Sequence, residues 1–258
     1  MNYSFSENHD VNKMLNQVVE SITSLANSQV MHIRRLTKIG ESLSSETDLH
    51  KIWDMILEEA VAFTNADGAT IYQLSEDGRY LDFKVLFNGT MGLRKGGVYG
   101  EVGWPSIPLF DTDGNPRLAH IVTNVFHLKR SLCFEDVYMQ DEYDISGTKK
   151  ADADHNYRSK SMLTIPLKNH EDEVLGVIQI INAMDEKGEI STFSEEHITM
   201  INSLASQAAI SLSNRKLIEG LELLLMQFMR SIATGIEKKS KYSSDHIMRV
   251  AMLTDMLA

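Results

Sequence analysis

A long apolar stripe near the C-terminal end of the sequence limits the possible folds more than any other feature. After the segment FSEEH, apolar residues recur at helical spacing, with Ile198, Ile201 and Leu204 on one face, and little sign of a stop appears before Ser240. A helix of about 40 residues is about 60 Å long at about 1.5 Å per residue, which exceeds what one small domain covers. We therefore expect a partner helix, most simply from a second copy of the chain.

A second helix is predicted near the N-terminus, over residues 11–43. Its apolar positions step by three, four and three residues, as in a coiled-coil seam: Leu15, Val18, Ile22 and Leu25. The seam blurs beyond Gln29, so a break or bend is expected before Gly40. The next helix is predicted to start after Asp48, a good N-cap residue, and to reach Phe63.

Between these helices the sequence has the alternation and turn signals of an antiparallel sheet. Two hairpins are predicted, formed by residues 69–74 with 80–87 and by residues 161–168 with 174–182. The last of these strands is nearly all apolar, so we expect it to be central in the sheet. Composition and local pattern predict four segments between the two hairpins. They are a long loop over 88–117, a short helix over 120–129, a strand over 131–137 and an aperiodic polar segment over 138–160.

Composition excludes several classes of function. The 25 basic and 36 acidic residues give a net charge of −11, which is a poor basis for binding nucleic acid. Cys133 is the single cysteine, so no internal disulfide can form, as is typical of a reducing cytosol. The N-terminus lacks the pattern of a signal peptide, and residues 221–229 are too short to cross a bilayer. We expect a cytoplasmic protein that binds neither nucleic acid nor membrane.

Several segments of the middle region resemble GAF domains, most closely those of cyclic-nucleotide phosphodiesterases and of bacterial HD-GYP signalling proteins. These segments are WPSIPLFDTDGNP (104–116), FEDVY (134–138), YDISGTKKAD (143–152) and NYRSKSMLTIPLKNHEDEVLGVIQIIN (156–182). The resemblance runs from about Leu49 to Leu217. It implies an α+β fold, with a GAF-type antiparallel sheet flanked by helices and long N- and C-terminal helices forming a dimeric bundle.

The resemblance also implies a pocket for a small molecule or nucleotide between the sheet and the loops that follow its strands. The expected ligand-binding residues are polar and lie where the resemblance is clearest: Thr70, Asp136, Tyr138, Tyr143, Asp152, Tyr157, Ser161, Thr164 and Gln179, with Asp144 and Ser159 in the wider set. Hydroxyls and an amide suit a purine edge or ribose, whereas carboxylates suit ribose hydroxyls or a cation. The alternative for each residue is structural, because strand Thr and Gln often face solvent and acidic loops are usually solvated.

The resemblance to nucleotide-binding GAF domains has a gap at one motif. Those domains carry Asn-Lys, then Phe, then Asp-Glu three residues further on, and this chain retains Asn182 and Phe193. Ala183 stands in place of the Lys and His197 in place of the Asp, so the Lys–Asp salt bridge that the motif implies cannot form. This departure weakens the case for cyclic AMP or cyclic GMP without excluding another ligand.

Residues 226–258 resemble the first helices of an HD-GYP phosphodiesterase domain, a family that hydrolyses cyclic-di-GMP at a site of two or three metal ions. The matching residues are Glu237, Lys239, Ser240, Tyr242, His246, Arg249 and Val250. The resemblance implies that His246 is a metal ligand only in a complete HD-GYP domain, with Fe or Mn as the divalent metal. No cofactor and no catalytic residue are predicted within this chain, because the remaining ligands of that family would follow Ala258.

Cys133 offers a second route to catalysis or to a covalent chromophore. In a predicted strand a free cysteine is usually a small buried hydrophobe. GAF domains that attach a bilin use a cysteine that is typically followed by histidine, whereas Phe134 follows here. We expect Cys133 to be structural.

Three hypotheses remain open from the sequence: a GAF sensor that regulates an HD-GYP phosphodiesterase, a metal-dependent phosphodiesterase that pools His246 from two subunits, and a purely structural dimerisation module. The predicted organisation is a helical extension over 1–45, a GAF sensor domain over 46–215, a linker and dimerisation helix over 216–240, and an incomplete start of an HD-GYP domain over 241–258.

Overall fold

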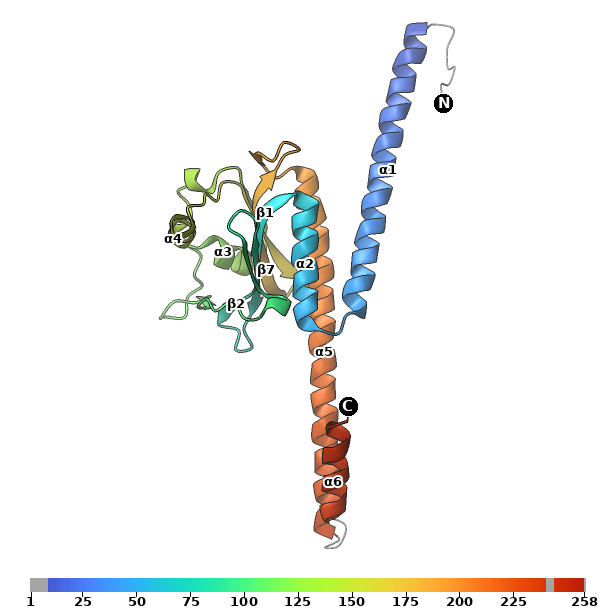
Figure 1. The fold of residues 1–258 in the computed structure, drawn as a ribbon, viewed down its shortest axis with the longest axis vertical. Helices are drawn as coiled ribbons and strands as arrows, with labels where there is room; N and C mark the ends of the chain where they lie inside the picture. The colour runs from blue at the N-terminus through green and yellow to red at the C-terminus, as the bar shows by residue number, and fades with distance from the viewer. Residues whose placement is uncertain (1–8, 240–243, 258) are drawn as a thin grey trace. The chain divides into compact units, whose positions relative to one another are not determined.

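The computed structural model describes residues 9–239 and 244–257. The chain divides into two compact units, residues 1–212 and residues 213–258. The first unit contains a sheet and the helices that cover it, and the second is helical (Figure 1).

In the first unit, the described residues form an eight-stranded sheet with the order β3-β2-β1-β7-β6-β5; β4 pairs with β2 and β8 with β7, and every pairing is antiparallel. The strands are β1 (Ala66–Leu74), β2 (Tyr80–Asn88), β3 (Leu93–Gly96), β4 (Ile107–Pro108), β5 (Leu132–Phe134), β6 (Met162–Lys168), β7 (Val174–Met184) and β8 (Ile190–Ser191). The two predicted hairpins are confirmed, and the apolar strand β7 is central, between β1 and β6.

The helices are α1 (His9–Ser45), α2 (Leu49–Thr64), α3 (Ile121–Leu128), α4 (Ser146–His155), α5 (Glu195–Lys239) and α6 (Ser244–Asp255), with short 3-10 turns η1 (Gly97–Tyr99) and η2 (Val137–Met139). The long C-terminal helix is confirmed: α5 has 45 residues. The predicted N-cap of α2 is confirmed too, because the Asp48 carboxylate accepts a hydrogen bond from the backbone N–H of His50 at 2.9 Å.

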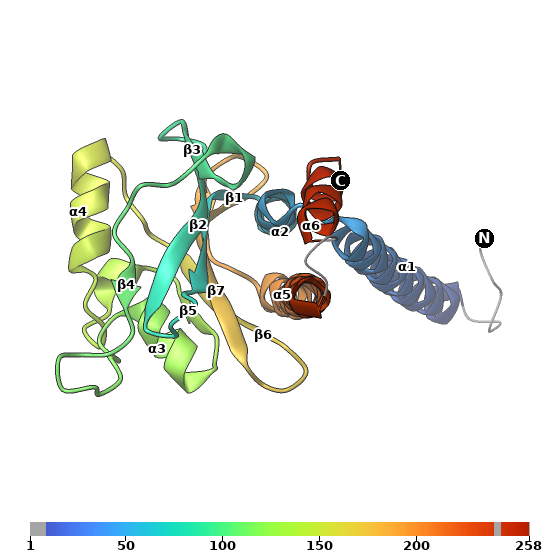
Figure 2. The ribbon, with the colours of Figure 1, turned by 90° about the horizontal axis from the view of Figure 1, so that it is seen from below.

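The sheet is covered on both faces (Figure 2). Helices α2 and α5 lie on one side, and α3 and α4 lie on the other. The alternation of side chains divides each central strand between these layers. On β1, Ala69 and Ile71 join the core under α2 and α5, whereas Tyr72 belongs to the cluster on the opposite face.

Two expectations about helices were wrong. Helix α1 continues through Gly40 without a break. The neighbouring Ile39 and Leu43 are buried in the core, so tertiary packing stabilises the helix on both sides of the glycine. The polar segment 138–160 contains the ten-residue helix α4, which has no apolar face for a periodicity search to detect.

Two further corrections concern loops and edges. The predicted loop over 88–117 contains the short strands β3 and β4, which pair with β2. Cys133 lies in strand β5 as expected, yet it is exposed rather than buried, because β5 is at the edge of the sheet.

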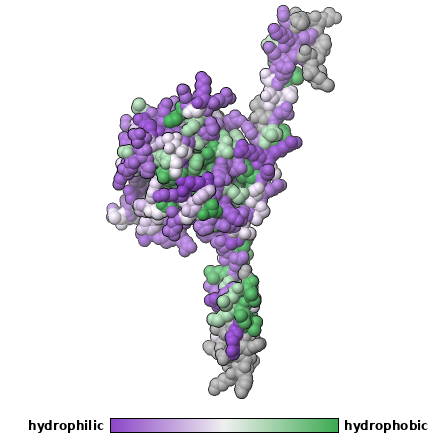
Figure 3. Space-filling model, in the orientation of Figure 1, coloured by the Kyte–Doolittle hydropathy of each residue, from purple (hydrophilic) through white to green (hydrophobic). Residues whose placement is uncertain are grey.

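In the second unit, large apolar side chains of α5 are exposed over residues 217–232. They include Leu217, Leu221, Leu224, Phe228 and Ile232, and they form the hydrophobic area on this helix in Figure 3. Among the described residues, no helix is long and apolar enough to cross a membrane.

A buried ion pair attaches the β3–η1 segment to helix α2. The Asp54 carboxylate is 6% exposed and accepts hydrogen bonds from the Arg94 guanidinium at 3.0 Å and from the backbone N–H of Val98 at 2.8 Å. Gly97 lies against this carboxylate with φ 54°, so a Cβ there would overlap the Asp54 oxygen atoms. Only glycine satisfies both the backbone conformation and the close approach.

The contact between Gly97 and Asp54 predicts a large stability difference between two glycine substitutions. Gly92 also has a positive φ, of 61°, but nothing lies within 4 Å of its added Cβ. Gly92→Ala should cost roughly 1–2 kcal/mol for the left-handed backbone alone, whereas Gly97→Ala should cost roughly 1–3 kcal/mol more because of the overlap. Urea denaturation monitored by circular dichroism measures both, and equal midpoints would contradict this account.

Candidate ligand-binding site

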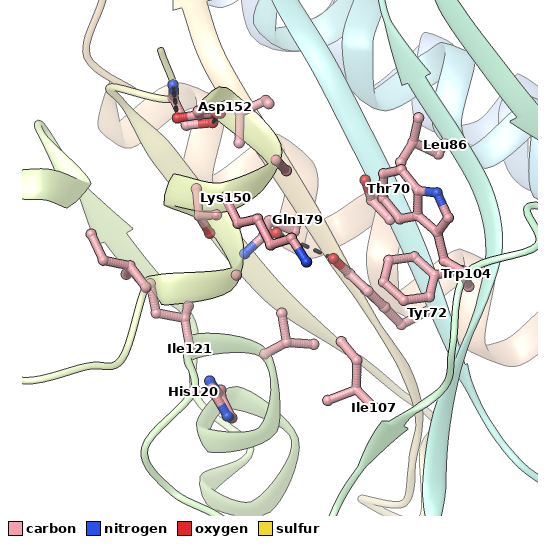
Figure 4. A pocket seen from close by; sticks show the side chains of 18 of the residues that line it. Thr70, Tyr72, Leu86, Trp104, Ile107, His120, Ile121, Lys150, Asp152 and Gln179 are labelled. Carbon is pink, nitrogen blue, oxygen red and sulfur yellow. Dashed lines mark hydrogen bonds between the residues drawn. The ribbon is translucent and has the colours of Figure 1, made fainter. Parts of the chain in front are cut away.

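A cavity of about 670 Å³ lies between the sheet and the layer that contains α3 and α4. Its lining is mostly apolar, from strands β1, β2, β6 and β7, the loop before β4, and the two helices. This combination of an apolar wall with a few polar groups is typical of small-molecule sites. Figure 4 shows the side chains that converge on it.

A row of polar residues crosses the middle of the sheet, and two of its members, Thr70 and Gln179, line the floor of the cavity. Thr70 on β1 pairs with Gln179 on β7, and Gln179 pairs with Thr164 on β6. The Gln179 amide donates to Oγ1 of Thr164 at 3.3 Å and accepts from the Tyr72 hydroxyl at 3.3 Å. Burial raises the pKa of Tyr72, against a hydrogen bond from Thr70, so this phenol stays protonated and acts as a donor.

Aromatic rings form one wall. The rings of Tyr72 and Phe83 lie 4.8 Å apart, and Phe83 meets Trp104 edge-on at 5.2 Å and 81°. Trp104 belongs to the loop before β4 and is 37% exposed. The wall therefore offers a planar ligand a ring to lie against.

Helix α4 covers the cavity and is held by one buried carboxylate. Asp152, 3% exposed, accepts hydrogen bonds from the Tyr138 hydroxyl at 2.9 Å and from the backbone N–H and hydroxyl of Ser159 at 2.7 and 2.9 Å. At the other end of α4, the Asp144 carboxylate accepts from the backbone N–H of Ser146 at 2.8 Å, and this bond holds the pKa of Asp144 below its usual value. Both carboxylates are thus used by the protein.

The structure places only part of the predicted set at this cavity. Thr70, Asp152 and Gln179 line it, as do Asp144 and Ser159 of the wider set. The others do not line the cavity, and each has a structural partner instead: Asp136, Tyr138, Tyr143, Tyr157, Ser161 and Thr164.

Three of these residues, Asp136, Tyr143 and Ser161, have partners away from the cavity. Asp136 pairs with Arg158 at 3.0 Å and caps η2. Although burial alone would raise the pKa of Asp136, hydrogen bonds from the Tyr138 backbone and from Arg158 lower it. Tyr143 is buried and donates to Glu142 at 3.1 Å, and Ser161 accepts from the backbone N–H of Ala183.

Tyr157 belongs to a buried network with Asp67 and Asn182. Its hydroxyl donates to the Asp67 carboxylate at 2.7 Å and accepts from the Asn182 amide at 2.7 Å. Burial, followed by the hydrogen bond to Asp67, raises the pKa of Tyr157. The network holds the segment between α4 and β6 against the end of the sheet.

Residues 48–212, well over half of the chain, match the family model of the GAF domain. The chain belongs to the GAF-domain family. GAF domains are sensory and regulatory domains of signalling proteins, and this fold and cavity agree with that class.

Solved GAF domains share the fold at low sequence identity. The GAF domain of an Acinetobacter phosphoenolpyruvate-protein phosphotransferase is 18% identical, with 74% of this chain and 98% of that chain covered and a TM-score of 0.53. The corresponding GAF domain from Coxiella burnetii is 12% identical, with 73% of this chain and 96% of that chain covered and a TM-score of 0.54. Residues 122 to 287 of a methyl-accepting chemotaxis protein are 17% identical, with 70% of this chain and 98% of that chain covered and a TM-score of 0.50.

The altered GAF motif has a physical counterpart in the structure. Ala183 is 1% exposed within the core, where a lysine ammonium would be costly to bury. The ring of His197 lies 6.3 Å from that of Phe193, and burial lowers the pKa of His197, so it is neutral at pH 7. A weak aromatic contact therefore stands where the motif has its acid.

The cavity residues that were missed from the sequence include Tyr72, Phe83, Trp104, Lys150 and His155. Tyr72 could have been found, because it lies two residues from Thr70 on the same strand and therefore on the same face. Trp104 gave a weaker signal, as a large aromatic residue in a loop rich in glycine and proline. The residues of α4 could not be placed, because the helix itself gave no periodic pattern.

The described residues include neither a cluster of metal ligands nor an activated thiol. Among the described residues, no three His, Cys, Asp or Glu side chains cluster as metal ligands. The side chain of His246 lies outside the described residues, so its role stays a prediction. Partial burial and the Glu195 and Glu135 carboxylates raise the pKa of the Cys133 thiol, which makes it a poor nucleophile at neutral pH.

The anchor of α4 predicts a local effect of one substitution. In Asp152→Asn, one accepting oxygen becomes an amide donor that faces other donors, so we expect a loss of about 1–3 kcal/mol of stability and faster hydrogen exchange at the amides of 146–159. The control is Asp154→Asn on the same helix, which changes an exposed carboxylate. Hydrogen-exchange mass spectrometry separates them, and equal protection in both variants would show that Asp152 is not the anchor.

Proposed function

We propose that this GAF domain senses a small molecule and regulates a cyclic-di-GMP phosphodiesterase domain of the HD-GYP type. The observation that carries the sensing role is the cavity of about 670 Å³, with its polar row and aromatic wall. The link to a phosphodiesterase rests on the resemblance of residues 226–258 to the first helices of that family.

The strands at the floor of the cavity supply a path from ligand to helices. Gln179 faces the cavity, while its neighbours Ile178 and Ile180 pack in the core with α2 and α5. A ligand that displaces the β1–β7 floor by a fraction of an ångström must repack that core, because close-packed interiors transmit strain. Helix α5 continues from this core to Lys239, so it is suited to relay the change.

The same helix is proposed to dimerise. Leu217, Leu221, Leu224 and Phe228 are each between 62% and 66% exposed, and they recur at steps of four, three and four residues, the spacing of a coiled-coil seam. A second copy of the chain is the simplest partner, since one seam then covers its equivalent. Two parallel copies would bring the attached catalytic domains together.

We therefore expect the purified chain to have the mass of a dimer in native mass spectrometry. Leu224→Lys should convert it to monomer, because two ammonium groups would face each other in the seam. Leu118→Lys is the matched control, since Leu118 is 43% exposed in a loop outside α5. A monomeric wild type, or a dimer that survives Leu224→Lys, would contradict dimerisation through this seam.

The sensing role predicts a retained or bindable small molecule. Ala151→Trp should fill the cavity from α4 and abolish small-molecule retention in native mass spectrometry, whereas Ala153→Trp, exposed on the same helix, should not. The altered motif predicts no thermal stabilisation by cyclic AMP or cyclic GMP. A chain that binds nothing, yet still dimerises, would favour a purely structural module.

The enzyme alternative has its own test. The chain, incubated with Mn²⁺ or Fe²⁺ and cyclic-di-GMP, is expected to show no turnover, because few of the family's metal ligands lie within it. Turnover that disappears in His246→Ala would instead support catalysis by ligands pooled from two subunits.

A further inference from the structure

We propose that the cavity takes a compact aromatic anion, in which an acidic group pairs with Lys150 and the ring lies against Trp104. This inference rests on the proposed sensing function, since it names the ligand class of the same cavity. The acid can be a carboxylate, a sulfonate or a phosphate, because each presents the same charge to an ammonium group.

The charges around the cavity leave Lys150 available. Asp144 and Asp152 also line the cavity, but their carboxylates already accept hydrogen bonds from α4, Tyr138 and Ser159. Lys150 extends from α4 into the cavity (Figure 4), and its ammonium forms no hydrogen bond or ion pair with another described residue. Asp154, one helical turn further on, is exposed and forms no ion pair with Lys150 among the described residues.

The histidines at the cavity do not replace this cation. The Arg117 guanidinium can only donate, so at 3.2 Å the Nε2 atom of His120 is the acceptor and its Nδ1 carries the proton toward the carbonyl of Asp144. Both ring nitrogens of His120 are therefore engaged by other groups of the protein. His155 donates from Nδ1 to the carbonyl of Ala151 at 2.9 Å. Among the described residues that line the cavity, Lys150 is the only lysine or arginine, so its ammonium is the group with which an anion in the cavity can pair.

The wall and floor favour a flat ring over an aliphatic chain. Trp104 is partly exposed, and its packing partner Phe83 meets it edge-on, which leaves indole surface for a second ring. On the floor, Gln179 has used its amide hydrogens on Thr164 and Met162 and one carbonyl lone pair on Tyr72. It therefore retains acceptor capacity for a polar hydrogen on the ring.

A matched pair of fluorescent probes tests both halves of the inference. The anion 8-anilinonaphthalene-1-sulfonate and the neutral N-phenyl-1-naphthylamine share a ring system and differ by the sulfonate. Both should bind the wild-type chain with enhanced fluorescence, and Ala151→Trp should remove the cavity-bound fraction, whereas Ala153→Trp should not. This comparison separates the cavity from the exposed apolar face of α5.

Lys150→Gln should weaken binding of the sulfonate about five- to tenfold, less than a fully buried charge pair would lose, and leave the neutral probe unchanged. Lys149→Gln is the control, because it removes the same charge from the neighbouring residue, whose ammonium lies over the Tyr138 ring. Asp154→Asn should strengthen sulfonate binding by about twofold, because it removes a nearby negative charge. Trp104→Ala should weaken both probes.

The outcomes distinguish this inference from the proposed function. If Lys150→Gln and Lys149→Gln change sulfonate binding equally, the pairing with Lys150 is wrong, while small-molecule binding stands. If Trp104→Ala leaves both probes unchanged, the placement of the ring is wrong. If neither probe responds to Ala151→Trp, the cavity does not bind such molecules, and the sensing function fails with the inference.

Discussion

The position of the cavity depends on one buried asparagine. Asn182 is fully buried on β7 with φ 56°, a left-handed conformation that asparagine tolerates better than most residues. Its amide donates to the Tyr157 hydroxyl and to the Arg158 carbonyl, and its side-chain oxygen accepts from the backbone N–H of Lys160 at 2.7 Å. These bonds fix the segment that leads from α4 into β6. A residue without an amide would leave several buried polar groups without partners.

The central strands connect this fixed segment to the helices. Strands β1 and β7 present alternate residues to the cavity and to the core beneath α2 and α5. A displacement of either strand at the cavity therefore also moves side chains in that core. The Asp54–Arg94 pair adds a second connection, because it attaches the β3–η1 segment, which leads toward Trp104, to α2. A sensor needs such shared elements between its pocket and its output helix.

Elements with a strong apolar periodicity were predictable from the sequence. The polar helix α4 and the environment of single residues were not. The two hairpins, the central place of β7 and the length of α5 followed from patterns of period 2 or 3.6. Helix α4 was missed because its residues carry no apolar stripe. The break or bend expected before Gly40 was wrong because burial of Ile39 and Leu43 in the core stabilises helix α1 on both sides of the glycine. The exposure of Cys133 depended on its strand being at the edge, which only strand order reveals.

By itself, the sequence determined the α+β class, the hairpins, the length of the two long helices and the GAF resemblance, because hydrophobic periodicity and turn chemistry depend on residues close together in the chain. Tertiary structure decided which polar residues face the cavity. Asp136, Tyr143 and Tyr157 matched the expected chemistry, yet ion pairs, burial and the Asn182 network engage them elsewhere. Lys150 became a candidate only because α4 carries it over the sheet, and that placement comes from hydrogen bonds of Asp152 with Tyr138 and Ser159 that no periodic pattern encodes.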